Sequence, residues 1–164
     1  MKFANVIHQC LCAGLLSVAA AAAWDGNFSV STDGQELTDV QNNLVWRRCA
    51  EGMNWNGSTC TGSASVFTHE AALQRAAAEA ANSGRAWRLP NIKELTSIVD
   101  RTRRGPAIDP TAFPATPIYL FWSGTPVFSN TASVSGWAVS FGDGGVGYSS
   151  RLSHFHVRLV RASQ

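Results

Sequence analysis

Apolar positions in the first part of the chain fall in short runs that are separated by turn residues. Residues 28–30 and 44–48 are β-prone runs, and the pairs Asp33-Gly34 and Asn42-Asn43 favour turns around them. The pattern predicts an early antiparallel hairpin.

The pattern changes over residues 68–82, which consist of strong helix formers. Thr68 suits the N-cap of a helix and Gly84 suits its stop, so one helix is predicted between them. Its apolar face is built of small side chains and can lie close on a neighbouring surface, while the opposite face stays in water. The apolar stripe comprises Ala72, Leu73, Ala76, Ala77 and Ala80, and the expected water-facing side chains are Gln74, Arg75 and Glu79.

A second helix is predicted to begin at Asn91, because Glu94 three residues later completes a capping box. Its buried face is expected to hold Leu95, Ile98 and Val99. Prolines then recur between residues 106 and 117, where neither a helix nor a central strand would tolerate them. We expect an ordered loop over that stretch.

The last third of the chain is rich in glycine and serine, which excludes long helices there. Residues 137–141 and 146–150 are strand-like runs, and the Gly-Asp-Gly-Gly sequence between them predicts a hairpin. A final strand is predicted from a third alternating run. Its inward side chains would be Phe155, Val157 and Leu159, and its solvent-facing side chains His154, His156 and Arg158.

Residues 1–23 have the features of a secretory signal peptide: Lys2, an apolar run from Leu11, and alanines at the exit. The run is too short for the roughly 20 residues that span a bilayer, so no integral membrane anchor is expected after its removal. A buried alanine-rich helix is the alternative interpretation. Cleavage before Trp24 would place the protein in the periplasm, at the cell surface or in the medium.

Removal of the leader leaves two cysteines, Cys49 and Cys60. Two cysteines in an exported protein indicate one disulfide, which would contribute roughly 3 kcal/mol by closing a short loop that carries Trp55. A cysteine metal site would need four ligands at short spacings and a redox pair would normally be C-x-x-C, and neither pattern occurs. A structural bridge is the prediction.

Length and charge narrow the class of protein further. The 164 residues, 45% of them hydrophobic, suit one globular domain after the leader. A formal net charge of +2 argues against a nucleic-acid partner recognised through massed positive charge. We divide the chain into the signal peptide, a lead-in over residues 24–36 and one domain over residues 37–164.

The candidate binding residues lie mainly near the C-terminus. Arginine binds sulfate or carboxylate through paired hydrogen bonds, histidine adds charge below about pH 6.5, and an aromatic ring offers a face to a sugar. These properties predict an anionic-glycan site made of Tyr148, Arg151, His154, His156 and Arg158.

Other residues could take part in binding elsewhere. Trp55 in the disulfide loop is the tryptophan expected at the surface. A cluster of arginines around residue 103 is either a second anion patch or a solvated loop. The cluster consists of Arg101, Arg103 and Arg104, and the tryptophans assigned to packing are Trp46, Trp87, Trp122 and Trp137.

Metal and catalytic chemistry find little support in the sequence. His154 and His156 could share a divalent metal, but alternating polar residues on a solvated sheet face need no ligand. No loop gathers the carboxylates that calcium requires, and no nucleophile elbow, P-loop or H-E-x-x-H helix is present. We expect no metal, no cofactor and no catalytic residues.

Several strings of residues, taken together, resemble the Lcl C-terminal domain family over about residues 37–162. The most specific is W-R-L-P-N-x-K-E-L, from Trp87 to Leu95. The others are Leu44-Val45-Trp46, the Cys49/Cys60 pair around Trp55, Ile108-Asp109 with Phe113, Phe121-Trp122-Ser123, Trp137-Ala138-Val139 with Phe141, and Val157-Arg158-Leu159-Val160-Arg161.

The resemblance implies an α+β, C-type-lectin-like fold shared with sulfatase-modifying factors, in which two helices pack on a twisted antiparallel sheet with long ordered loops and one disulfide. The best-known member role is adhesion by a collagen-like trimeric surface protein that binds sulfated glycans. The sequence has no Gly-x-y repeat of that kind. The wider fold also includes a copper-dependent oxidase with a reactive cysteine pair in its C-terminal strands, a position that Cys49 and Cys60 do not share.

These observations predict an exported, non-catalytic module for ligand binding or adhesion, with a glycan or another envelope component as its partner. The first alternative is a structural or accessory subunit of an envelope assembly, and the second is an oxidase of the sulfatase-modifying type. A large exposed apolar patch would favour the protein partner, and a polar groove lined by arginine and histidine would favour the glycan. Oligomerisation is compatible with a glycan partner and with a protein partner.

Overall fold

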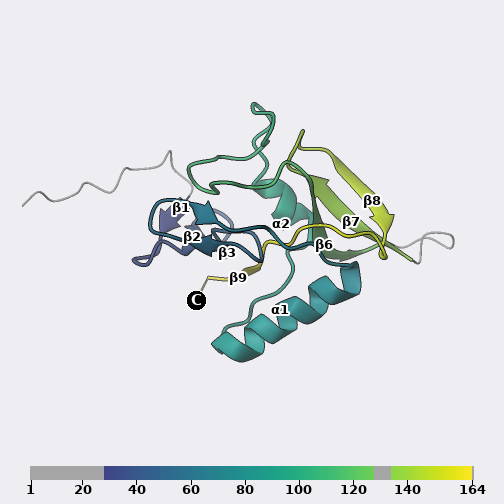
Figure 1. The fold of residues 1–164 in the computed structure, drawn as a ribbon, viewed down its shortest axis with the longest axis horizontal. Coiled ribbons are helices and arrows are strands. Elements are labelled where there is room, and N and C mark those ends of the chain that lie inside the picture. The colour runs from purple at the N-terminus through teal and green to yellow at the C-terminus, as the bar shows by residue number, and fades with distance from the viewer. Residues whose placement is uncertain (1–27, 128–133, 164) are drawn as a thin grey trace, which may run out of the picture.

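The computed structural model describes residues 28–127 and 134–163, so the predicted signal peptide lies outside the described residues. Within them, two helices accompany antiparallel strands, which confirms the α+β class, but the strands form three sheets rather than the single twisted sheet that was expected (Figure 1). In chain order the elements are β1 (Phe28–Val30), β2 (Glu36–Asp39), β3 (Leu44–Arg47), β4 (Asn54–Trp55), β5 (Cys60–Thr61), α1 (His69–Ser83), α2 (Ile92–Ser97), β6 (Leu120–Pro126), β7 (Ser135–Ser140), β8 (Val146–Ser150) and β9 (Val160–Ala162).

The first sheet has the order β1-β2-β3-β9, and all of its pairs are antiparallel. The predicted early hairpin is therefore a three-stranded meander, in which the turns fall where they were expected. The sequence did not predict β2, because only Leu37 among its four residues is apolar. Leu37 is completely buried opposite Trp46, and this single contact face fixes the register of the strand.

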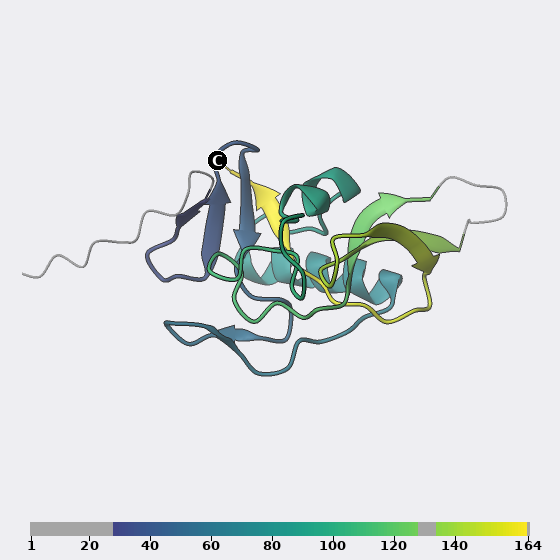
Figure 2. The same ribbon diagram turned by 90° about the horizontal axis from the view of Figure 1, so that it is seen from above.

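The third sheet, β6-β7-β8, contains the hairpin predicted in the last third of the chain. Gly144 adopts a positive φ of 79° in its turn, a conformation that glycine reaches without strain. The two larger sheets lie at opposite ends of the molecule, and the β4-β5 hairpin forms an arm along one side (Figure 2).

The C-terminal segment differs from the predicted continuous strand. Only Val160–Ala162 forms a strand, and residues 155–159 run extended between other elements, with isolated bridges from Phe155 to Phe67 and from His156 to Phe121. Phe155, Val157 and Leu159 are buried as predicted. The opposite side of this segment is also covered by protein, because the segment passes through the interior rather than over a solvated sheet.

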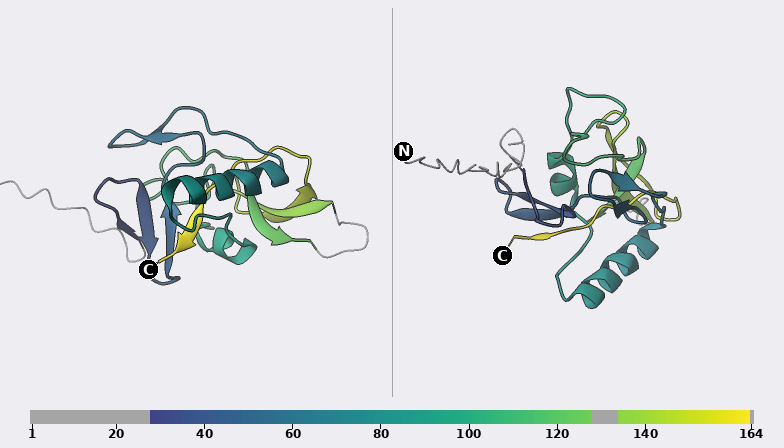
Figure 3. Two further views of the ribbon diagram at one scale, coloured as in Figure 1. Left: turned by 90° about the horizontal axis from the view of Figure 1, so that it is seen from below. Right: turned by 60° about the vertical axis from the view of Figure 1, so that its left-hand side comes forward.

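Helix α1 begins and ends as predicted, with the Thr68 hydroxyl accepting from Ala71 N–H and Gly84 in the left-handed conformation. Ala72 and Ala76 are buried against large aromatic side chains, among them Trp122. Leu73 is exposed, which corrects its assignment to the apolar stripe, and so is Ala77. The buried face is thus narrower than predicted, and α1 lies below both sheets along the molecule (Figure 3).

Helix α2 has the predicted capping box between Asn91 and Glu94. Leu95 and Ile98 enter the larger apolar core together with aromatic residues of β3, β6 and the proline-rich loop. That loop is ordered, because Ile108 and Phe113 anchor it in the same core.

His69 is buried at the start of α1, where its Nε2 donates to the main-chain oxygen of Ser123 at 3.0 Å. Its ring stands edge-on to Trp122 and contacts Gly136, where a Cβ atom would come within 2.7 Å of the imidazole. Burial lowers the pKa of His69, and burial likewise lowers the pKa of His156.

Acidification is therefore expected to destabilise the fold. The unfolded chain takes up a proton near pH 6.5, whereas the folded chain holds these histidines neutral to lower pH, so the free energy of unfolding falls as the pH drops below about 6.5. Urea unfolding at pH 8 and at pH 5 measures the loss. The variant His69→Gln should reduce the pH dependence and the exposed control His154→Gln should not; an unchanged dependence in His69→Gln would contradict the assignment.

Candidate functional site

The described residues contain a polar cleft of about 300 Å³ between the end of β3, the β4-β5 hairpin and one face of α1. We call it the charged cleft. It brings together three chain segments that the sequence keeps apart. Its lining consists of Gln35, Arg47, Cys49, Ala50, Glu51, Gly52, Met53, Asn54, Trp55, Arg75 and Glu79.

The hairpin side of the charged cleft is fixed by covalent and aromatic contacts. The predicted disulfide joins Cys49, next to β3, to Cys60 in β5. Trp55 of β4 pairs with Cys60 across the hairpin and carries the Arg48 guanidinium 4.0 Å from its ring centroid. The half-buried indole also packs against Gly34, where a Cβ atom would come within 2.5 Å of Nε1. The Trp55 ring is therefore held in a fixed position at the rim.

The helix side of the charged cleft is a chain of alternating charges. Arg75 donates from Nε to Glu51 at 2.6 Å and from Nη2 to Glu79 at 2.9 Å, and Glu79 also binds Arg47 of β3. The hydrogen bond that Arg75 donates to Glu51 is the main cause that raises the pKa of Arg75. The four side chains carry two positive and two negative charges, so the cleft is polar yet balanced in charge.

The same charged network continues behind the cleft into the first sheet. The Arg47 guanidinium lies 4.6 Å from the ring centroid of buried Trp87, and Arg161 of β9 lies 5.3 Å from it. Arg161 binds Glu36 at 2.8 Å, and Glu36 also binds Arg85. Helix α1 thus packs on the first sheet through small alanines and paired charges. The contacts of Arg47 with Trp87 fix the position of this charged group on the side away from the cleft.

This arrangement suits recognition of a polar ligand. Planar guanidinium, carboxylate and amide groups present hydrogen-bond donors and acceptors at fixed positions, and the indole at the rim supplies an apolar face. Concave sites with a few oriented polar groups and an aromatic wall are where small ligands bind.

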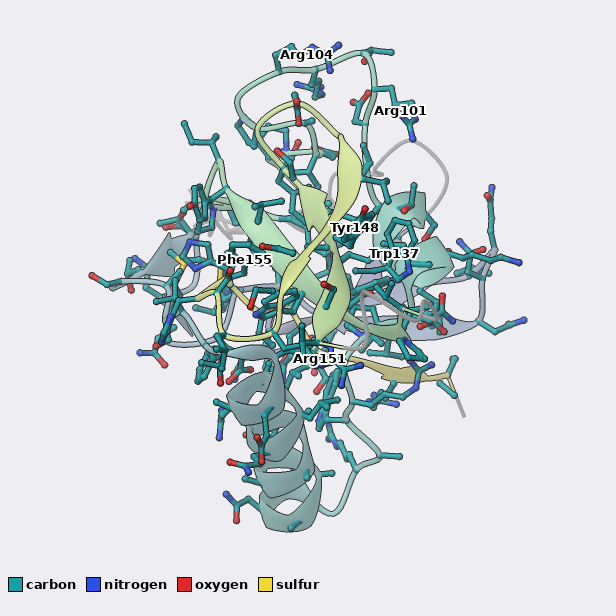
Figure 4. The ribbon with its side chains drawn as sticks, turned by 90° about the vertical axis from the view of Figure 1, so that its right-hand side faces the viewer. Arg101, Arg104, Trp137, Tyr148, Arg151 and Phe155 are labelled. Atoms are coloured by element: carbon teal, nitrogen blue, oxygen red, sulfur yellow. A yellow bond between two sulfur atoms is a disulfide. The ribbon has the colours of Figure 1, made fainter. Side chains whose placement is uncertain are left out.

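The predicted anionic-glycan residues are only partly brought together. Tyr148 on β8 is 62% exposed and stands edge-on to Trp137, with ring centroids 5.7 Å apart. Arg151 follows the strand, is half-buried and donates from Nε to the Ser135 oxygen at 3.0 Å. Figure 4 shows Tyr148 and Trp137 side by side at the sheet surface, with Arg151 beyond the end of the strand. Trp137 is half-buried and outside the core, which corrects its assignment to packing.

The other residues of that predicted stripe point in different directions. His154 is exposed, but His156 is half-buried, with its Nδ1 3.0 Å from the Ser65 oxygen and its ring against Phe121. Arg158 is completely buried, which corrects its assignment to a solvent-facing side. The alternating pattern predicts a half-exposed strand, whereas this segment is enclosed by protein on both sides.

Arg158 has a structural environment. Its guanidinium donates to the main-chain oxygens of Arg47 and Arg48 and, at 2.8 Å, to the Thr116 hydroxyl, and it lies 4.7 Å from the Phe113 ring centroid. Burial lowers the pKa of Arg158 to about 9. The side chain ties β3, the proline-rich loop and the C-terminal segment together directly behind the charged cleft.

The arginines around residue 103 lie on an exposed loop. Arg103 binds Asp100 at 2.8 Å and Arg104 donates to the main-chain oxygen of Asp143. Arg101 and Arg104 lie at the end of the molecule away from α1 (Figure 4). No group of three or more histidine, cysteine, aspartate or glutamate side chains within residues 28–127 and 134–163 could hold a metal ion.

Comparison with known proteins decides the family. A family model described as the Lcl C-terminal domain matches residues 35–161. The chain belongs to the Lcl C-terminal domain family. No curated protein and no solved structure matches the chain.

The charged cleft lies wholly within this Lcl C-terminal domain, since its first lining residue is Gln35 and its last is Glu79. The sequence had indicated Trp55 but had placed Arg75 and Glu79 in water. Their spacing of four residues was the available signal, because side chains so spaced meet on one face of a helix. Arg47 and Glu51 could not be found in this way, since their partners come from a distant segment.

None of the helices in the described part of this Lcl C-terminal domain is both long enough and apolar enough to cross a membrane.

Proposed function

We propose that this Lcl C-terminal domain is an exported, non-catalytic module that binds a glycan in the charged cleft. The observation that carries the proposal is the cleft itself, which is lined both by Trp55, fixed on a disulfide-closed hairpin, and by a row of paired guanidinium and carboxylate groups. Sugar hydroxyls are both donors and acceptors and match such mixed walls, and the apolar face of a sugar ring stacks on an indole.

The balance of charge favours an uncharged saccharide. Arg47 and Arg75 already share Glu51 and Glu79, so an anionic ligand would have to compete with carboxylates that these guanidiniums bind. A hydroxyl can accept from one group and donate to the other without breaking an ion pair. The proposal therefore moves the binding site from the C-terminal stripe to the cleft and changes the ligand from anionic to neutral.

Two finer proposals accompany the function. The C-type-lectin-like fold is supported by two helices, antiparallel sheets, long ordered loops and the pairing of β3 with the C-terminal β9. Export through the segment 1–23 is supported by the Cys49–Cys60 disulfide, because such bridges persist in oxidising compartments.

A glycan array probed at low and high salt tests the binding proposal. The protein should bind neutral saccharides with little dependence on salt, because no net charge pairs with the ligand. Trp55→Ala should weaken binding by at least roughly tenfold, as expected for an aromatic anchor. Asn54→Ala, an exposed change at the cleft wall, should weaken it less. Tyr148→Ala is the matched aromatic control on another surface and should bind normally.

Two results would overturn the cleft assignment. One is binding that survives both Trp55→Ala and Asn54→Ala, in variants whose thermal unfolding shows that they remain folded. The other is binding restricted to sulfated glycans, weakened by salt and lost in Arg151→Ala, which would return the site to the C-terminal stripe.

A subunit of an envelope protein assembly is the second candidate. Exposed large apolar side chains lie along β8 and just beyond its C-terminal end, and they favour this function because contact with a protein would remove them from water. They include Val134, Val146, Tyr148 and Leu152.

A further inference from the structure

Strand β8 forms one edge of the β6-β7-β8 sheet, and no strand among the described residues pairs with its outer side. Five successive residues pair with β7 in a regular antiparallel register, from Ser150 opposite Ser135 to Val146 opposite Val139. The strand is therefore continuous, and its outer side presents main-chain groups to solvent.

The hairpin turn determines which of those groups point outward. Ser140 N–H donates to the Gly145 oxygen at 2.8 Å, which makes residues 140 and 145 a hydrogen-bonded pair. Bonded and non-bonded pairs alternate along an antiparallel ladder. The main-chain N–H and C=O groups of Val146 and Tyr148, and the N–H of Ser150, therefore point away from β7 toward the open edge.

The other edges of the two larger sheets are protected and β8 is not. Edge strand β9 has three residues, carries Arg161 and is bridged by Arg88, and β1 is equally short. The outer side of β6 is bridged by His156, and the strand ends in Pro126. Short length, charge, proline and coverage are the usual ways in which an edge avoids pairing with another chain. The sequence of β8, Val-Gly-Tyr-Ser-Ser, has none of them.

The same edge is surrounded by exposed apolar side chains. Val146 is 44% and Tyr148 is 62% exposed on the strand, and Val134 at 65% and Leu152 at 80% lie at its end, where Arg151 N–H binds the Val134 oxygen. An open hydrogen-bonding edge with apolar side chains around it is a surface for another β-strand.

We propose that β8 pairs in an antiparallel manner with β8 of a second copy of this chain, with the two-fold axis at Tyr148. In that register Tyr148 is opposite Tyr148 and Val146 is opposite Ser150. The outward N–H and C=O groups of the two Tyr148 residues pair with each other, and Ser150 N–H meets the Val146 C=O group. The pairing is self-complementary, as a two-fold interface requires.

Charge is compatible with this occupant. The strand itself is uncharged, so two copies do not repel each other along it. At each end, Arg151 of one copy comes opposite Gly145 of the other, two residues from the exposed Asp143 carboxylate. Arg104 binds the main-chain oxygen of Asp143 rather than its carboxylate, whose Oδ1 accepts from Gly145 N–H at 3.0 Å.

Sedimentation and light scattering of the purified protein test the proposal directly. The protein should have twice the mass of one chain and dissociate on dilution. Tyr148→Lys would place two ammonium groups opposite each other at the two-fold axis and should yield the mass of a single chain. Leu73→Lys adds the same charge at an exposed apolar position on α1 and should remain a dimer. A wild-type protein that stays monomeric, or a Tyr148→Lys protein that stays dimeric, overturns the proposal.

Hydrogen exchange locates the interface. The amides of Tyr148 and Ser150 should exchange at least roughly tenfold more slowly in the dimer than after dilution, because each gains a hydrogen bond. Exchange at Gly147 and Ser149, whose amides face β7, should change little. Protection elsewhere in a dimer, without protection at β8, would assign the contact to another surface. Trp55→Ala should leave the dimer intact, so this inference and the glycan proposal can fail separately.

Discussion

Replacing Arg158 with alanine is expected to lower the free energy of unfolding by about 3–5 kcal/mol. The change empties a completely buried space and removes the donors to the main-chain oxygens of Arg47 and Arg48 and to Thr116. Buried oxygens that lose their partner cannot recover one from water. Urea unfolding followed by far-UV circular dichroism measures the effect.

Two comparisons separate the geometry of Arg158 from its charge. Arg158→Lys keeps a positive charge but lacks the forked donors, so it should also be strongly destabilising. Arg101→Ala removes an exposed guanidinium and should change stability by less than about 0.5 kcal/mol. If Arg158→Ala were as mild as Arg101→Ala, Arg158 would not have the structural role described above.

Removal of the disulfide in the double variant Cys49→Ala/Cys60→Ala is expected to cost roughly 3 kcal/mol of stability, the value for closing a loop of this length. The loss should be concentrated in the β4-β5 hairpin, since the bridge ties this two-stranded arm to the end of β3. Small two-stranded hairpins are marginal without such support.

The measurement combines urea unfolding with hydrogen exchange of the hairpin amides. The variant is compared with oxidised wild-type protein and with wild-type protein treated with a reductant. The reduced wild type should have the same stability and hairpin exchange as the variant. Unchanged stability in the variant, or exchange that is faster throughout the fold but not in the hairpin, would contradict the assigned role of the bridge.

Features that depend on neighbouring residues in the chain could be predicted from the sequence. Thr68, Gly84 and the Asn91–Glu94 capping box act within one helical turn, so their residue types are sufficient to place both helices. The hairpin between β7 and β8 follows from its glycine-rich turn in the same way. The disulfide could be predicted because few cysteines remain after the leader.

Features that depend on long-range packing could not be predicted. The alternation around Arg158 is the same whether one side of the segment faces water or an aromatic cluster, and only the folded chain shows Phe113 beside the guanidinium. Strand β2 has one apolar residue and exists because Leu37 meets Trp46. In both cases tertiary contacts outweigh the local pattern.

The residues of the candidate site likewise include one that local sequence features indicate and several that only long-range packing brings together. Trp55 could be singled out because it lies in the disulfide loop. The ion pairs beside it in the cleft, Glu51–Arg75 and Arg47–Glu79, join residues that are 24 and 32 positions apart in the chain. A charged helix face is ordinarily solvated, and nothing local marks Arg75 and Glu79 as the wall of a cleft. The cleft is a property of the fold and not of any single motif.

The most direct test is to titrate the protein with the neutral saccharide that binds best on the array. Nuclear magnetic resonance follows the side-chain N–H signals of the tryptophans during the titration. The account predicts that the Trp55 indole signal moves in proportion to occupancy, while those of Trp137 and Trp122 stay in place. A signal at Trp137 that moves while Trp55 remains unchanged would contradict the charged cleft as the binding site.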